Sequence, residues 1–122
     1  MESSNHEYIN LNYLDQVAGD DTKTRATLLD LIAKELEEII PQLLPLYSAN
    51  AWEAIKSHVH RMKTTLAFAG NAEMITANNQ IWKVLVAMES PESTGPMIQT
   101  LTANYLHIVG ELKTELLSMK ES

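Results

Sequence analysis

The chain has 122 residues, enough for one domain with a single core but not for a catalytic domain together with a regulatory one. Its formal charge of −7 opposes the phosphate contacts that nucleic-acid binding needs, and no apolar run approaches the roughly 18 residues that span a membrane. Without cysteine there is no disulfide framework or thiolate metal site, and the opening MESSNHEYIN lacks the basic and apolar regions of a signal peptide, so we expect a cytoplasmic protein.

A short helix is expected first. Asn10 is a residue type that caps helix N-termini, and Gly19 is the type that ends helices, so the helix should run to about Ala18. The residues expected on its apolar side are Leu11, Leu14 and Val17.

A long helix follows, capped by Asp20 or Asp21. Its apolar residues recur at spacings of three and four, the period of a helix that buries one stripe: Leu28, Ile32, Leu36, Ile39, Leu43 and Leu46. Pro41 and Pro45 fall inside this pattern, away from the stripe. Because a proline inside a helix deletes a backbone hydrogen bond, we expect one helix bent near residues 37–41 rather than two helices.

A third helix is expected to begin near Ala51, where Asn50 and Glu53 have the spacing of a capping box. Gly70 is its expected stop. The residues predicted to face inward are Trp52, Ile55, Val59, Met62, Leu66 and Ala69.

Two more helices are predicted in the remainder of the chain. Asn71 can cap the first, which should end before Pro91 and whose apolar face is Met74, Ile75, Ile81, Trp82, Leu85 and Met88. The run ESPESTGP, residues 89–96, is the expected loop. The last helix should extend from about Met97 to Ser118, with a buried stripe of Leu101, Tyr105, Ile108, Leu112, Leu116 and Met119.

The predicted fold is therefore all-α. Four amphipathic helices with short connections favour an antiparallel up-and-down four-helix bundle, with the short first helix as an addition. We expect one domain over residues 1–122, with the bundle core at about residues 21–119. The methionines and tryptophans on the predicted stripes are explained by packing in this core.

Residues 57–70, SHVHRMKTTLAFAG, stand out against the acidic background. From residue 56 to residue 63 the chain has three basic residues, two histidines and no carboxylate. Each helical residue turns the side-chain direction by about 100°, which places His60 roughly 130° from the centre of the inward stripe. His60 should therefore face outward, on a ridge with Ser57, Thr64 and Ala67, whereas His58 should flank the core as an ordinary boundary residue.

An exposed histidine with a cation beside it suits group transfer. Imidazole near neutral pH is partly unprotonated and nucleophilic, and Lys63, one turn on, could offset the charge of a phosphoryl group on His60. His58 and His60 are two residues apart, so they point away from each other on a helix and cannot share a metal ion. From spacing alone, an ordinary surface histidine remains the commoner explanation.

The other charged or titratable groups are expected to be solvated surface residues. These are His6, His107, the glutamates at 35, 37 and 38, and the acidic residues near the C-terminus. The sequence contains no nucleophile elbow and no glycine-rich phosphate loop, so we expect a carrier without catalytic activity of its own.

At HRMKTTLAFAG the chain resembles the histidine-containing phosphotransfer (HPt) domain family. The matching positions are His60, Met62, Lys63, Thr65 and Gly70, which lies ten positions after the histidine. The Gly-Asp turn, the proline-bearing long helix and the tryptophan helix that precede His60 extend the resemblance over most of the chain.

The resemblance implies a phosphorelay intermediate. His60 would accept a phosphoryl group from a phospho-aspartate of a response-regulator receiver domain and pass it to another receiver, with a hybrid sensor histidine kinase upstream and Lys63 as electrostatic support. The magnesium ion and the catalytic aspartates would belong to the receiver, so no cofactor or metal is expected in this chain. We expect a monomer that binds neither nucleic acid nor membrane.

Thr64 is a departure from the family pattern, which has glycine four residues after the histidine. Its side chain narrows the space beside the imidazole, and its hydroxyl could either bond the phosphoryl group or hinder the receiver. Ser57, Arg61, Ala67 and Phe68 are the expected docking residues; for Phe68 the equal alternative is packing beneath a neighbouring loop. The competing hypothesis for the whole protein is a non-phosphorylated adaptor that binds receivers or partner helices.

Overall fold

The computed structural model describes residues 6–121, which form five α-helices, one 3₁₀ turn and no strand. The helices are α1 (Asn12–Ala18), α2 (Thr22–Ser48), α3 (Trp52–Ala69), α4 (Ala72–Ala87) and α5 (Gly95–Glu121), and the 3₁₀ turn η1 (Pro91–Thr94) precedes α5. All regular secondary structure in residues 6–121 is thus helical, as predicted. None of the helices in this range combines the length and apolar character needed to cross a bilayer.

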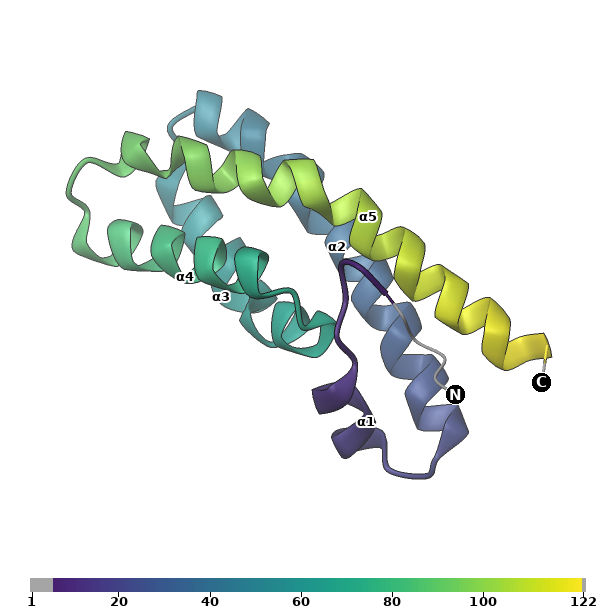
Figure 1. Cartoon of the computed structure of the whole chain (residues 1–122). Helices are drawn as coiled ribbons and strands as arrows, with labels where there is room; N and C mark the ends of the chain where they lie inside the picture. The colour runs from purple at the N-terminus through teal and green to yellow at the C-terminus, as the bar shows by residue number, and fades with distance from the viewer. Residues whose placement is uncertain (1–5, 122) are drawn as a thin grey trace.

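The four long helices lie side by side (Figure 1). α2 packs against α3 and α5, and α4 packs against α3 and α5, while the short α1 lies against α2 and α3. The core between them is built from the predicted stripes. Its fully buried large side chains include Leu36, Ile39, Leu43, Ile55, Met62, Leu66, Met74, Ile81 and Leu85.

Local sequence sets several helix ends where predicted. The Asp21 side chain accepts hydrogen bonds from the backbone N–H groups of Lys23 and Thr24, and so caps α2. Gly70 ends α3 in the left-handed conformation, φ +74°, and Asn71 caps α4 by accepting from the backbone N–H of Met74. α2 continues through Pro41 and Pro45 as one helix.

The predicted capping box at Asn50 is wrong. Asn50 adopts φ +56° in the turn that closes α2, where its N–H donates to the Tyr47 carbonyl and the N–H of Ala51 donates to the Leu46 carbonyl. These two bonds are the pair that ends helices in a left-handed residue. Asparagine tolerates that conformation, so here it terminates the preceding helix instead of starting the next one.

The expected loop at residues 89–96 is largely helical. Pro91–Thr94 forms η1, and α5 begins at Gly95 rather than at Met97. Pro96 fits inside the first turn of α5 because an N–H at that position would have no helical partner. The predicted burial of Met88 is also wrong: it ends α4 in a left-handed conformation and is 50% exposed.

Residues 6–11 form a segment that we call the N-terminal strap. It begins against α5 and then crosses the α3–α4 turn before it reaches α1. The backbone N–H of Asn10 donates to the Ala69 carbonyl at 2.9 Å, and the Asn71 side chain donates to the Tyr8 carbonyl at 2.8 Å. The N-cap position of α1 is Leu11 and not Asn10, but the Asn10 side chain still accepts a hydrogen bond of 3.0 Å from the backbone N–H of Asn12, the first residue of α1. Val17, predicted to be buried in α1, is 52% exposed.

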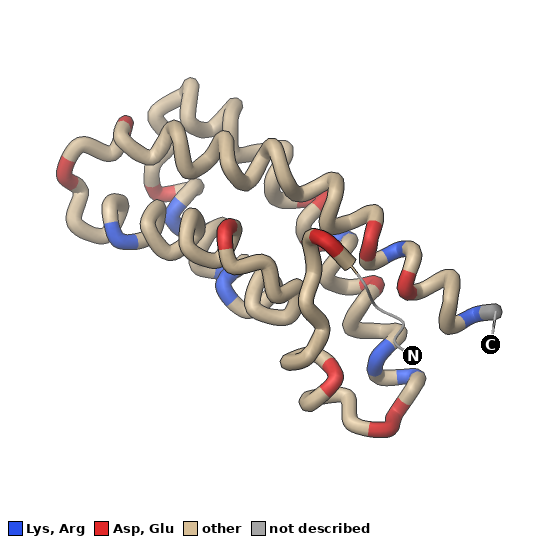
Figure 2. Tube along the Cα trace, viewed as in Figure 1, with Lys and Arg blue, Asp and Glu red and all other residues tan. Residues whose placement is uncertain are grey.

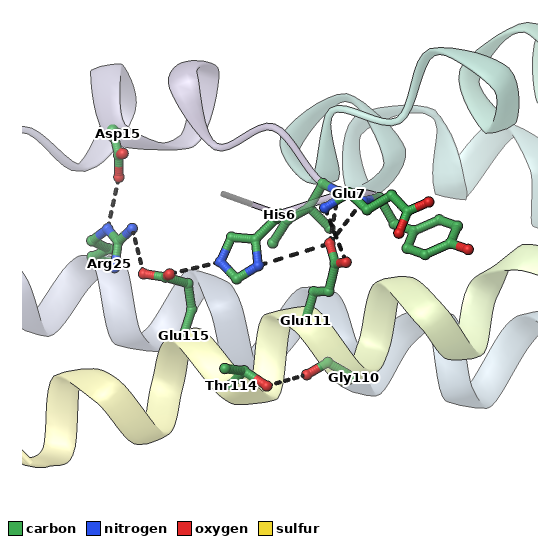
Figure 3. A network of polar contacts seen from close by, with 10 residues as sticks. His6, Glu7, Asp15, Arg25, Gly110, Glu111, Thr114 and Glu115 are labelled. Atoms are coloured by element: carbon green, nitrogen blue, oxygen red, sulfur yellow. Dashed lines mark hydrogen bonds and ion pairs between the residues drawn. The ribbon is translucent and has the colours of Figure 1, made fainter. Parts of the chain in front are cut away.

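Two glutamates of α5 hold the strap (Figure 3). The Glu111 carboxylate accepts hydrogen bonds from three consecutive backbone N–H groups, those of residues 7, 8 and 9, at 2.8–3.1 Å. His6 Nε2 lies 2.8 Å from Glu115, which also accepts from Arg25 of α2. The prediction that His6 and these glutamates are solvated surface groups is therefore wrong, because the strap and α2 cover them.

Candidate functional site

α3 presents His60 to solvent. The buried side of this helix comprises Ile55, Val59, Met62, Thr65, Leu66 and Ala69, and the opposite side carries Ser57, His60 and Thr64, all exposed. Ala67 lies at the end of the same ridge and is half-buried, as is His58 on the flank of the core. The helical rotation thus separates the two histidines as the sequence predicts.

The imidazole of His60 has one aromatic neighbour. Its ring centroid lies 5.0 Å from that of Trp82 on α4, and the ring planes are inclined by 32°. Within residues 6–121 the His60 ring makes no hydrogen bond or ion pair. Trp82, expected in the core, is half-buried at its edge, with part of the indole covered by the apolar cluster.

The basic side chains of α3 differ in whether an acidic side chain pairs with them. Acidic and basic residues are mixed along α2 and α5 (Figure 2), whereas the charged residues of α3 that follow Glu53 are all basic. Lys56 pairs with Glu53 at 3.4 Å, whereas Lys63 has no ion-pair partner among the described residues and is exposed. Lys63, one turn from His60, is therefore the cation available to a negatively charged group there.

Arg61 forms ion pairs with two glutamates of α2. Its Nε lies 3.1 Å from Glu35, and another guanidinium nitrogen lies 3.7 Å from Glu38. Glu35 also accepts a hydrogen bond from the hydroxyl of the buried Thr65. The prediction that Glu35 is a solvated charge is therefore wrong, and the positive charge of Arg61 is partly offset within the protein.

A shallow groove runs between α2 and α3 beside this ridge. Its apolar floor includes Leu28, Leu31 and Phe68, and Thr64 and Arg61 lie along its α3 side. Phe68 is half-buried and stacks on Tyr13 of α1, with centroids 4.9 Å apart and planes inclined by 22°. This contact corresponds to the packing alternative for Phe68, although α1 rather than a loop provides it.

Thr64 and Thr65 differ in exposure and in hydrogen bonding. Its side chain is exposed, and its hydroxyl has no hydrogen-bond partner within residues 6–121, whereas the hydroxyl of Thr65 is committed to Glu35. A hydroxyl one turn from His60 is thus available to a bound group.

Asn78 on α4 also supports the site, although it is not among the site residues predicted from the sequence. Its side chain is buried and donates a hydrogen bond of 2.8 Å to the carbonyl of Val59, the residue before His60, while its own Oδ1 has no partner among the residues that the structure describes. The sequence does carry a signal for it, since Met74, Asn78, Ile81 and Leu85 recur at helical spacing. A polar residue within an apolar stripe indicates a specific buried bond.

No cluster of three or more metal-ligating side chains occurs in the part of the chain that the structure describes. Comparison with models of known protein families gave no match to this chain, and no curated protein or solved structure matches it either. The likeness of residues 60–70 to the HPt family therefore remains a resemblance of motif.

Proposed function

We propose that this protein is a phosphorelay intermediate that carries a phosphoryl group on His60. The observation that carries the proposal is an exposed imidazole without hydrogen-bond partners in residues 6–121, one helical turn from the unpaired ammonium of Lys63. Such a histidine can enter another protein's active site, and an adjacent cation favours a phosphoryl group on it.

The transfer step requires little of this chain. The unprotonated ring nitrogen of His60 attacks phosphorus, the bond between phosphorus and the partner's aspartate breaks, and its electron pair leaves with the carboxylate. The ring proton stays on the other nitrogen. Lys63 offsets the phosphoryl charge, Thr64 offers a hydrogen bond, and the receiver supplies the magnesium ion and the aspartates. The protein is thus a carrier and not an enzyme.

The proposed scaffold is an antiparallel up-and-down four-helix bundle. Support comes from the packing order, because each of the four long helices packs against the next one in sequence and α5 packs against α2. Short connections between successive helices favour antiparallel neighbours. In this arrangement α1 is the additional short helix.

The proposed docking surface is the outer ridge of α3 with the adjoining groove. Ser57 and Ala67 flank the central His60 and Thr64, and Arg61 and Phe68 contribute from the groove. The partners would be receiver domains, with a hybrid sensor histidine kinase upstream, and the carrier would act as a cytoplasmic monomer. Because Arg61 is already paired with Glu35, its part in docking is weaker than that of an unpaired arginine.

The test is phosphoryl transfer from receivers. The full-length protein is mixed with each phosphorylated receiver of its source organism, and the label that it gains is tested for the acid lability and alkali stability of phosphohistidine. We expect labelling of the wild type and of the matched control His58→Gln, and none of His60→Gln. Label that persists in His60→Gln would contradict the assignment. Receivers that bind without transferring label would favour the adaptor function.

A further inference from the structure

Trp82 is the only residue of the described chain whose ring contacts the proposed phosphorylation site. It comes from α4, a different helix from His60. We propose that Trp82 is a positioning residue, which holds the His60 imidazole so that its nitrogen-bearing edge faces a docked receiver. This inference rests on the proposed function.

The ring geometry suits this role. The planes of His60 and Trp82 are inclined by 32° and the ring centroids are 5.0 Å apart, too close for two rings that lie edge to edge, so part of the indole lies over a face of the imidazole. The nitrogen lone pair that attacks phosphorus lies in the plane of the imidazole ring. A neighbour on the ring face restricts rotation of the side chain yet leaves this lone pair accessible.

The indole is itself held in place. Trp82 is half-buried and packs against the apolar core, so the protein restricts its rotamers before any partner binds. Asn78, one turn earlier on α4, donates its hydrogen bond to Val59, the residue before His60. This buried bond fixes α4 against α3 at the level where the two rings meet.

An exposed histidine without such a neighbour would sample several rotamers, and docking would have to select one. Aromatic contacts of this kind stabilise the paired arrangement by about 0.5–1.5 kcal/mol. If that preference is lost, transfer from a docked receiver should slow by about two- to twelvefold. Reaction with a small donor that approaches from any direction should change less than twofold.

The experiment compares two phosphoryl donors. Variants Trp82→Leu and Trp82→Phe are treated with the phosphorylated receiver that labels the wild type fastest and, separately, with inorganic phosphoramidate. In the latter reaction the imidazole nitrogen attacks phosphorus, the P–N bond breaks and ammonia leaves. We expect Trp82→Leu to be slow only with the receiver and Trp82→Phe to retain the wild-type rate, because a smaller aromatic ring preserves the contact.

Trp52→Leu is the matched control. Trp52 is also half-buried, and its ring contacts Tyr47, not His60. Its loss should leave both rates unchanged, whatever it does to stability. Should Trp82→Leu fail to fold, as judged by circular dichroism, Trp82→Met replaces it, since methionine fills apolar space without a ring.

Fluorescence provides a readout of the contact that does not depend on transfer. In a Trp52→Phe background Trp82 is the only tryptophan, and the emission of an indole responds to the ring packed against it. We expect the emission spectrum of Trp82 to change when His60→Gln is introduced into this background. If the emission is the same with and without His60, the ring contact itself is contradicted.

The remaining outcomes are distinguishable. Equal receiver rates for wild type and Trp82→Leu would overturn the positioning role while leaving the carrier function in place. Equal slowing with both donors would also overturn it, because positioning for a docked partner should not affect phosphoramidate. Absence of transfer to the wild type from every receiver would contradict the proposed function and, with it, this role of Trp82.

Discussion

At the scale of single residues, one glycine is required by both conformation and space. Gly70 has φ +74°, and a Cβ at this position would overlap the backbone carbonyl of Asn10 in the N-terminal strap. That overlap is with backbone, which cannot rotate away as a flexible side chain would. Gly110 differs in both respects: it lies inside α5, and a Cβ there would meet nothing within 4 Å.

We therefore expect opposite effects from the same substitution. Gly70→Ala should lower the free energy of unfolding by at least about 2 kcal/mol, from the left-handed backbone and displacement of the strap. Gly110→Ala should raise it by about 0.5–1 kcal/mol, because alanine favours the helix interior. Urea denaturation of both variants measures the difference. Equal stabilities would mean that the strap does not lie against Gly70 as described.

At the scale of elements, Glu111 fastens the strap to α5. Three consecutive backbone N–H groups donate to this one carboxylate, which provides an acceptor for amides that have no other partner in regular structure. The strap in turn bonds to the end of α3 through Ala69 and to the start of α4 through Asn71. Glu111 thus holds the N-terminal segment on α5, while two other hydrogen bonds hold it at the end of α3 and the start of α4.

Glu111→Ala should release the strap. Loss of the shared acceptor should cost about 1–3 kcal/mol locally, because the partly buried N–H groups of Tyr8 and Ile9 are left unpaired. Hydrogen exchange at the amides of Glu7, Tyr8 and Ile9 should accelerate, whereas amides in the middle of α3 should change little. The matched control is Glu89→Ala, an exposed glutamate in the segment after α4. Unchanged exchange at residues 7–9 would contradict the fastening role.

At the scale of the whole molecule, Glu115 joins segments far apart in sequence. It bonds His6 of the strap and Arg25 of α2, and Arg25 also bonds Asp15 of α1 (Figure 3). Burial alone would raise the pKa of Glu115, but the hydrogen bonds and charges of His6 and Arg25 outweigh it, and the pKa lies below its ordinary value of 4.5. The folded protein therefore retains this carboxylate in its ionised form to lower pH than the unfolded chain does.

The lowered pKa gives stability a pH dependence of defined sign. The contribution of Glu115 is complete above about pH 4.5 and is lost as the pH falls through its folded-state pKa, because the unfolded chain binds the proton first. Glu115→Gln should be less stable than the wild type near neutral pH by about 1–2 kcal/mol, and the two should converge in acid. Thermal unfolding from pH 7 to pH 3 measures this. A stability difference independent of pH would contradict it.

The sequence by itself determined the helices, several of their ends and the outward direction of His60. Apolar spacing indicates most of the buried face of each long helix, and the caps at Asp21, Gly70 and Asn71 act on residues within the same few positions, so these features are local. The separation of His60 from His58 follows from helical rotation alone. Asn50 shows where local sequence patterns are insufficient, because asparagine can either end one helix or begin the next.

Only the tertiary structure decided which side chains meet. The pairing of Arg61 with Glu35, of His6 with Glu115 and of His60 with Trp82 each joins two segments whose relative position no local pattern encodes. A helix period shows that a side chain leaves the core stripe, but what covers it depends on the neighbouring helix and its register. The sequence therefore identifies the histidine, while the packing of α4 against α3 supplies the aromatic ring beside it.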